Sequence, residues 1–180
     1  VIVLTTIPSG VDVAVSCPFY PVGGFATAYT SDAVTAQLLG CPTGNPPITF
    51  QVNGAYQVFE RGLMIWLEGS PNRIYALYND GSYQQFADTF DENVDPETGG
   101  QTPPQGLWEP TRGFGKVWRN QPSVKANLGW ARNSEIADLA TIQDFTRGQM
   151  IYIPTRGNIL ALIMNPDGST GTWKSLEGSF

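Results

Sequence analysis

The sequence predicts a mainly β protein built from two pseudo-symmetric repeats, each with one short helix and a four-stranded antiparallel meander. Three observations carry this prediction: an internal duplication, short apolar runs bounded by turn residues, and a high content of turn formers. The chain has 20 Gly and 14 Pro in 180 residues, which favours many turns and short elements over long helices. An extra strand segment is expected at the N-terminus.

The duplication consists of three blocks of similar residues that occur twice in the same order. Residues 24–41 match 113–130, and the Phe-x-Arg-Gly block 59–66 matches 145–152. The third block places Ile-Tyr-Ala-Leu and Asp-Gly-Ser of the first copy on Ile-Leu-Ala-Leu and Asp-Gly-Ser of the second. The predicted organisation is an N-terminal strand segment (1–16), repeat one (17–86), an acidic, proline-rich linker (87–112) and repeat two (113–180).

A short helix is expected after the Gly-Phe pair of each repeat. In repeat one, Ser31 or Asp32 can cap a helix over 33–39, and Gly40 stands where a helix ends in the left-handed conformation. Repeat two has the same signals, with Asn120 as the cap, Pro122 in the first turn and Gly129 as the stop.

The remainder of each repeat has the pattern of strands joined by tight turns. Asn79-Asp80-Gly81 has the residues that a hairpin turn requires. The expected strands are 56–59, 63–67, 73–78 and 83–86 in repeat one, and 142–145, 149–153, 158–164 and 171–176 in repeat two.

These motifs resemble repeat modules of bacterial surface proteins. Segment 106–118 with 128–131 resembles uncharacterised tandem-repeat modules of Chloroflexota-type bacteria. Leu-Gly-Cys-Pro at 39–42, followed by the block 59–66, is loosely similar to LGFP repeats, although repeat two has Ala131 in place of Pro42. The resemblance implies an extracytoplasmic, non-catalytic binding or structural role in a cell envelope.

The N-terminal segment contains two strand-like runs. Its β-branched and apolar residues are Val1, Ile2, Val3 and Leu4, then Val11, Val13 and Val15 in alternation with small or polar residues. We expect an edge strand added to the chain's own sheet, or a strand donated to a neighbouring subunit. The third interpretation is the tail of a processed signal or anchor.

The two cysteines, Cys17 and Cys41, are 24 residues apart and have no counterparts in repeat two. A single pair without further soft ligands favours one disulfide in an oxidising, extracellular compartment over a metal site. Two buried free thiols are the alternative.

Composition excludes several classes of function. The chain has no His, so it lacks the base of Ser-His-Asp or Cys-His catalysis and any imidazole ligand. A formal net charge of −6 argues against nucleic-acid partners, and no apolar run is long enough for a transmembrane segment. Glu60 and Glu68 are acid–base candidates by residue type alone, because the matched positions are Thr146 and Pro154. We therefore expect no enzymatic activity and no cofactor.

Four matched residues are candidate contacts to a ligand or partner. Arg61 and Arg147 could bind a carboxylate or phosphate, or instead satisfy a loop carbonyl or a nearby carboxylate. Trp66 and Tyr152 belong to a set of recurring aromatics that could stack on sugar rings or pack in a core. That set also contains Tyr29, Tyr75, Trp118, Trp130 and Trp173.

The linker is rich in acids, namely Asp88, Asp91, Glu92, Asp95 and Glu97. They could bind Ca²⁺ or form a solvated linker, and their spacing is not that of an EF-hand. Together these patterns predict a non-enzymatic extracellular module of a bacterial cell envelope that binds cell-wall polysaccharide or another surface polymer. The alternative is a self-assembling subunit of a surface filament or layer that donates residues 1–16 as a strand.

Overall fold

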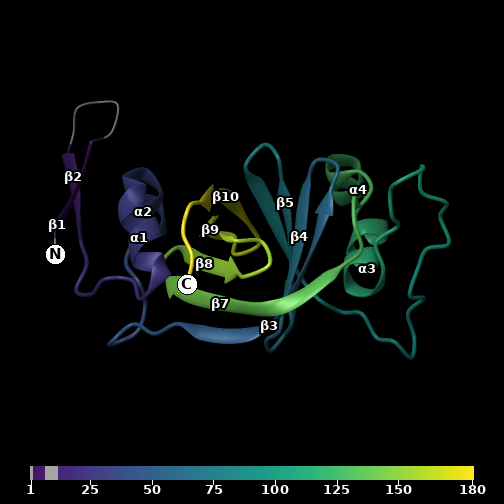
Figure 1. The fold of residues 1–180 in the computed structure, drawn as a ribbon, viewed down its shortest axis with the longest axis horizontal. Coiled ribbons are helices and arrows are strands. Elements are labelled where there is room, and N and C mark those ends of the chain that lie inside the picture. Colours follow the sequence, from purple (N-terminus) through teal and green to yellow (C-terminus); the bar gives the residue numbers. More distant parts are fainter. Residues whose placement is uncertain (1, 7–11) are drawn as a thin grey trace. The chain divides into compact units, whose positions relative to one another are not determined.

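The computed structural model describes residues 2–6 and 12–180, and for residues 2–6 and 12–15 it describes the backbone alone. Within these residues the chain forms ten strands and four short helices, labelled in Figure 1. The helices are α1 (Gly24–Ser31), α2 (Ala33–Leu39), α3 (Arg112–Asn120) and α4 (Pro122–Leu128). The first six strands are β1 (Ile2–Thr6), β2 (Asp12–Ser16), β3 (Phe50–Phe59), β4 (Gly62–Leu67), β5 (Arg73–Tyr78) and β6 (Ser82–Ala87). The last four are β7 (Ile136–Phe145), β8 (Gly148–Ile153), β9 (Asn158–Met164) and β10 (Thr170–Leu176).

Eight antiparallel strands form a closed barrel in the order β10-β6-β5-β4-β3-β7-β8-β9. The order contains two meanders, one of β3 to β6 and one of β7 to β10, in which each strand pairs with the next along the chain. The mainly β class and the two four-stranded meanders are therefore confirmed.

A close approach at the first turn of each meander explains a matched glycine. Gly62 and Gly148 both have φ 151°, a region that L side chains rarely adopt. A Cβ atom at these positions would lie 2.0 Å from the Leu77 carbonyl oxygen and 1.9 Å from that of Leu162. Only glycine lets the turn sit this close to the neighbouring strand.

The chain folds into two compact units, Val1–Val52 with Leu139–Phe180 (unit 1) and Asn53–Asp138 (unit 2). These units cut across the two predicted repeats. Unit 1 contains the helices of repeat one and strands β8 to β10 of repeat two. Unit 2 contains strands β4 to β6 of repeat one and the helices of repeat two. Each helix pair is thus in the same unit as the meander of the other repeat.

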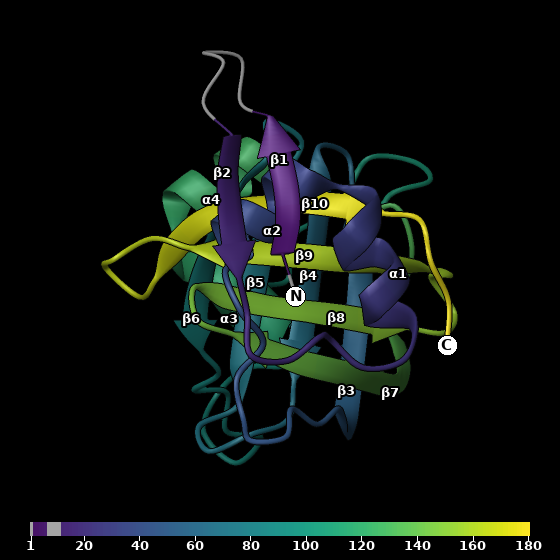
Figure 2. The ribbon, with the colours of Figure 1, turned by 90° about the vertical axis from the view of Figure 1, so that its left-hand side faces the viewer.

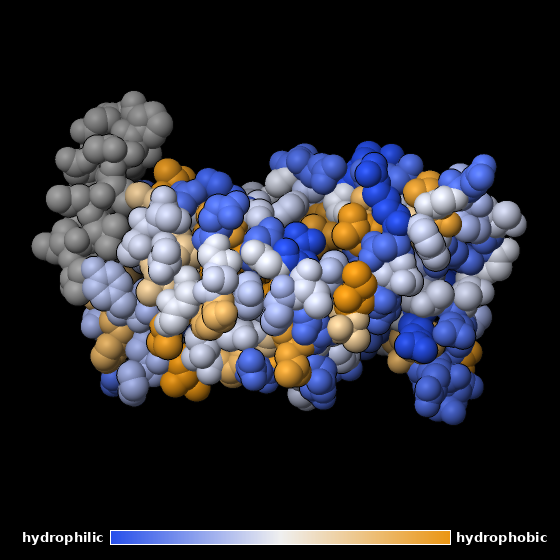
Figure 3. All heavy atoms as spheres, in the orientation of Figure 1, coloured by the Kyte–Doolittle hydropathy of each residue, from blue (hydrophilic) through white to orange (hydrophobic). Residues whose placement is uncertain are grey.

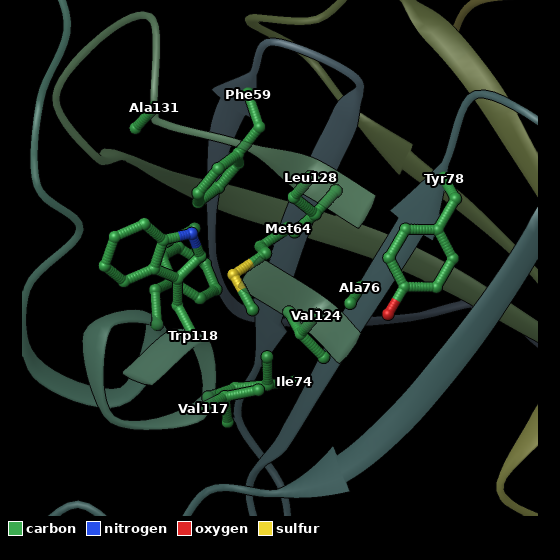
Figure 4. Packing of buried hydrophobic residues seen from close by; sticks show 12 residues of the cluster. Phe59, Met64, Ile74, Ala76, Tyr78, Val117, Trp118, Val124, Leu128 and Ala131 are labelled. Atoms are coloured by element: carbon green, nitrogen blue, oxygen red, sulfur yellow. The ribbon is translucent and has the colours of Figure 1, made fainter. Parts of the chain in front are cut away.

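The core of unit 2 shows how a helix pair and a meander share one apolar cluster. Trp118 from α3 and Leu128 from α4 are fully buried against Met64 from β4. Figure 4 shows these three side chains pointing toward one another, with Phe59 from β3 above them. Burying apolar surface of this size is the main favourable term that holds the helices on the sheet.

The core of unit 1 uses similar residues at the matched positions. Phe25 and Leu39 from the helices are completely buried with Met150 and Ile159 from the sheet. Tyr29 stacks on Phe145 with ring centroids 5.5 Å apart. Both cores therefore have a large aromatic residue on the first helix and a Leu at the end of the second.

The expectation of one short helix per repeat is wrong, because each repeat has two. The expected helices are α2 and α4, and the side chain of Asp32 caps α2 by accepting from the Thr35 amide at 3.0 Å. At α4, Gln121 rather than Asn120 is the cap residue, without a side-chain bond, and Pro122 occupies the first turn. The additional helices α1 and α3 have no side-chain cap bond: Gly23 precedes α1, and Thr111 precedes α3 without bonding to it through its side chain. Burial of one face stabilises them instead.

The N-terminal segment forms a separate hairpin. Strands β1 and β2 pair antiparallel, with Ile2 opposite Ser16 and Thr6 opposite Asp12, in a two-stranded sheet of their own. In Figure 2 this hairpin lies beside α2. The expectation of an edge strand added to the larger sheet is therefore corrected. Val1 and Val11 lie outside the described residues, while Ile2, Val3 and Leu4 are in β1 and Val13 and Val15 are in β2.

Cys17 and Cys41 form a disulfide, with their Cα atoms 5.4 Å apart, as the sequence predicts. Cys17 follows β2 directly, and Cys41 comes two residues after the end of α2. The bond therefore ties the base of the N-terminal hairpin to the C-terminal end of α2.

The described surface has no extended apolar face in the view of Figure 3, where hydrophobic residues lie singly or in small groups among hydrophilic ones. Among residues 2–6 and 12–180, no helix is long and apolar enough to cross a membrane.

Replacing both cysteines, as Cys17→Ser with Cys41→Ser, should lower the free energy of unfolding by about 3 kcal/mol, because the unfolded chain regains the entropy of an open loop. Denaturant unfolding with and without a reducing agent measures the change. Reduction should destabilise the wild-type protein and leave the double variant unaffected. Equal unfolding midpoints for the two oxidised proteins would contradict the prediction.

Tyr78 should make stability fall in alkaline solution. Burial, with a smaller contribution from the charge of Asp80, raises the pKa of Tyr78 to about 12, and its hydroxyl donates to Gln84 Oε1 at 2.6 Å. The folded state favours the neutral phenol, so this contribution is complete below pH 10 and is lost as the pH rises through about 12. Ultraviolet titration should show a step near pH 12 that Tyr78→Phe removes and Tyr20→Phe, at an exposed position, leaves in place. If the step near pH 12 is still present in Tyr78→Phe, the assignment to Tyr78 is wrong.

Candidate functional site

The end of α4 is closed by groups from two other elements of unit 2. The last carbonyls of a helix have no partner within the helix and must be satisfied from elsewhere. Here Arg61, in the turn between β3 and β4, supplies three donors, and Trp118 on α3 supplies the fourth. The bonds run from Arg61 Nη2 to Ala126 (2.7 Å), Arg61 Nε to Asn127 (3.0 Å), the Arg61 amide to Leu128 (3.0 Å) and Trp118 Nε1 to Gly129 (2.7 Å).

The end of α2 in unit 1 is closed in the same way. The donors are Arg147, in the turn between β7 and β8, and the hydroxyl of Tyr29 on α1. Arg147 donates to the carbonyls of Gln37, Leu38 (Nε, 2.7 Å) and Leu39 (amide, 2.9 Å), and Tyr29 Oη donates to Gly40 at 2.9 Å. The sequence leaves two roles open for Arg61 and Arg147, namely binding an anionic ligand or satisfying a loop carbonyl or nearby carboxylate. In the structure both arginines donate to backbone carbonyls.

The other two candidate contacts do not join the arginines in one site. Trp66 is half-buried against the core of unit 2, and its Nε1 donates to Asp88 Oδ2 at 2.8 Å. Tyr152 is 8% exposed in the core of unit 1, with its ring centroid 5.5 Å from that of Phe180. Tyr152 therefore has little surface for stacking on a sugar, and the indole nitrogen of Trp66 is already engaged.

A different set of residues lines an open groove of about 490 Å³ in unit 2, a volume within the range of small-molecule sites. The groove lies along the helix pair and the β3–β4 turn. Its charged and apolar lining includes Glu60, Arg61, Arg119, Pro122, Lys125 and Trp130.

Glu60 fixes the position of Trp130 at one side of the groove. Its Oε2 accepts from the Trp130 amide at 2.8 Å, and its own amide donates to the Trp130 carbonyl at 3.0 Å. Gly129 has φ 75°, and a Cβ atom there would lie 2.3 Å from Glu60 Oε2. The helix stop is therefore also a requirement of the groove.

Lys125 lies over the two indoles of the groove. Its Nζ is 4.3 Å from the ring centroid of Trp118 and 5.4 Å from that of Trp130, distances typical of cation–π contacts. The ammonium also donates to Gln101 Oε1 at 2.6 Å. Trp118 is fully buried, whereas Trp130 is half-buried and available to a ligand.

Comparison of the matched positions separates residues that hold the scaffold from residues that do not. Arg61 and Gly129 of the groove correspond to Arg147 and Gly40, which make the same helix-closing bonds in unit 1. Among the other lining residues, the three charged ones and Trp130 have uncharged, non-aromatic counterparts: Glu60 corresponds to Thr146, Arg119 to Thr30, Lys125 to Ala36 and Trp130 to Cys41. Since unit 1 holds its helices without them, these four are the best candidates for a function.

The sequence indicated only part of this site. Trp130 belongs to the recurring aromatics and Glu60 is a candidate acid, whereas no local motif marks Lys125 or Arg119 as a site residue. The mismatch between the repeats at these positions was the available signal, because a duplicated scaffold needs similar residues at similar places.

The acids of the linker are partly engaged by neighbouring cations. Asp95 Oδ2 lies 2.6 Å from Lys116 Nζ, and this hydrogen bond is the main cause that lowers the pKa of Asp95. Glu97 Oε1 lies 3.5 Å from Arg112 Nε. In the described part of the chain, no group of three or more acids or cysteines is placed to hold a metal ion.

Comparison with known proteins adds no relative: no protein-family model, no curated protein and no solved structure matches the chain.

Arg147→Met should lower the free energy of unfolding by about 1 kcal/mol, because the helix carbonyls lose their side-chain donors at an exposed site. Arg147→Lys should restore little of this, since an ammonium lacks the planar fork. Denaturant unfolding measures both, with Arg112→Met as the control, because Arg112 has an exposed ion pair with Glu97. Equal stability of Arg147→Met and the wild type would show that these bonds contribute nothing.

Proposed function

We propose that this protein is a non-enzymatic, extracellular module of a bacterial cell envelope that binds cell-wall glycan in the groove of unit 2. The observation that carries the proposal is the gathering of Glu60, Arg119, Lys125 and Trp130 in one groove, at positions where unit 1 has Thr, Thr, Ala and Cys. Unit 1 closes its helix ends without charged or aromatic side chains at these four positions, and their presence in unit 2 supports a ligand-binding role.

The chemistry of the groove suits a sugar. A pyranose ring presents an apolar face of C–H groups and an edge of hydroxyls. An indole provides a large, rigid surface on which the apolar face can stack, and charged side chains can hydrogen-bond to the hydroxyls. Trp130 and its neighbours Glu60 and Lys125 supply both kinds of contact within one groove of unit 2.

The cellular setting is supported by the disulfide. Disulfides persist in oxidising compartments and are rare in the cytosol, so the Cys17–Cys41 bond favours an extracytoplasmic location. The assignment to a cell envelope rests on the resemblance of the repeats to surface-protein modules.

A binding role is favoured over hydrolysis by the composition of the groove. Hydrolysis of a glycosidic bond by paired carboxylates requires two facing acids. Among the described residues that line the groove, Glu60 is the one carboxylate, and its Oε2 is held by the Trp130 amide.

The alternative of a self-assembling subunit has weaker support. Strand donation would need residues 1–16 to pair with another chain, whereas β1 and β2 pair with each other. Deleting residues 1–16 separates the two proposals: the glycan module should remain a folded monomer that binds, and an assembling subunit should lose its polymers.

Trp130→Ala should weaken binding to protein-free bacterial cell wall and to soluble fragments of it by about tenfold, because the ligand loses its stacking face. Co-sedimentation and calorimetry measure the affinity. Trp108→Ala is the matched control: Trp108 is 45% exposed and its backbone pairs with Ala131, but it does not line the groove. Unchanged affinity in Trp130→Ala, or a loss only in Trp108→Ala, would place the ligand elsewhere, and failure of the wild type to bind any envelope glycan would refute the function.

A further inference from the structure

The charge of the groove differs from that of the chain. The protein has a formal net charge of −6, yet three of its ten basic residues, Arg61, Arg119 and Lys125, line one groove together with the single acid Glu60. A concentration of positive charge on an acidic protein favours an anionic ligand, because the groove attracts it while the rest of the surface does not.

Within the part of the chain that the structure describes, none of these three cations forms an ion pair with a carboxylate. Ion pairs within residues 2–6 and 12–180 join Arg112 to Glu97, Lys116 to Asp95 and Lys174 to Asp32. The groove cations instead contact neutral groups: Arg61 donates to helix carbonyls, Arg119 to the Pro96 carbonyl at 3.2 Å, and Lys125 to the amide of Gln101. Their closest polar contacts are therefore neutral, which leaves the cations able to pair with an anionic ligand.

The distance between Lys125 and Trp130 indicates how far the negative charge of a ligand can lie from the ring that stacks on the indole. The ammonium of Lys125 is 5.4 Å from the ring centroid of Trp130, so a carboxylate beside this indole can accept a charge-assisted hydrogen bond from it. In a hexuronic acid the carboxylate is bonded directly to the pyranose ring. One such residue can stack on the indole and place its carboxylate near the ammonium at the same time.

We propose that the groove of unit 2 recognises acidic glycans, and that Lys125 binds the carboxylate of a uronic acid residue whose ring stacks on Trp130. This inference rests on the proposed function and adds the chemical class of the sugar. Glu60, on the Trp130 side of the groove, orients the ligand by repelling a carboxylate placed there. The matched positions of unit 1 have Ala36 and Cys41 in place of Lys125 and Trp130, so unit 1 has no equivalent site.

The test uses the full chain and matched pairs of ligands. Oligomers of galacturonic, glucuronic and mannuronic acid are compared with their methyl esters, which keep the ring and remove the charge, and with neutral N-acetylhexosamine oligomers. Affinity is measured by calorimetry at low and high salt. The wild type should bind at least one acid at least tenfold more tightly than its ester, and high salt should reduce this preference.

Substitutions of Lys125 and of Lys116 test whether the preference for acidic oligomers depends on Lys125. Lys125→Met should abolish the preference for the acid over its ester. Lys125→Arg should retain the preference, which shows that the loss is one of charge and not of fold. Lys116→Met is the control, because it removes the same charge from α3 of the same unit, where Lys116 is already paired with Asp95; it should leave the preference unchanged.

The outcomes distinguish this inference from the proposed function. Equal affinity for acids and esters, or binding of the neutral oligomers alone, would overturn the acidic ligand and leave the glycan-binding module standing. A preference that survives Lys125→Met would overturn the role of Lys125. Failure to bind any of the oligomers and cell wall would overturn both proposals.

Discussion

Each compact unit depends on the closing of a helix end by a turn of the sheet. The carbonyls at the ends of α2 and α4 have no partner within their own helices and must be satisfied by other elements. An arginine in the first turn of each meander and an aromatic donor on the preceding helix bond to them. Leu39 and Leu128, the last residues of these helices, are buried in the two cores. Hydrogen bonds and apolar burial therefore hold the same helix end against the same meander.

The residue that follows this closure has two different uses. In unit 1 it is Cys41, which bonds to Cys17 and anchors the N-terminal hairpin. In unit 2 it is Trp130, whose amide is held by Glu60 and whose indole lines the groove. In both units the arginine and the glycine before this position close the end of the helix. The side chain of residue 41 or 130 is therefore not needed for that closure. A covalent tie or a ligand contact can then occupy it without loss of the scaffold.

Most strands could be predicted from the sequence, and the helices and the site only in part. Apolar runs bounded by Asn-Asp-Gly and similar turns mark strands because the side-chain alternation and the turn residues are local properties. Helices α2 and α4 have stop signals at Gly40 and Gly129, whereas α1 and α3 lack capping side chains and are stabilised by burial. For Arg61 and Arg147 the residue type allowed a ligand or a carbonyl, and only the position of the helix end distinguishes them.

The β class, the two meanders and the cysteine pair can be predicted from the sequence alone, since they follow from residue types at short range or from the absence of other cysteines. The tertiary structure decided which helix pair packs with which meander, because an amphipathic pattern shows that a face is buried and not what covers it. It likewise decided the groove: Glu60 is far from Lys125 and Trp130 along the chain, and they meet because the β3–β4 turn closes the end of α4. Contacts between distant segments are set by the packing of whole elements, which no local pattern encodes.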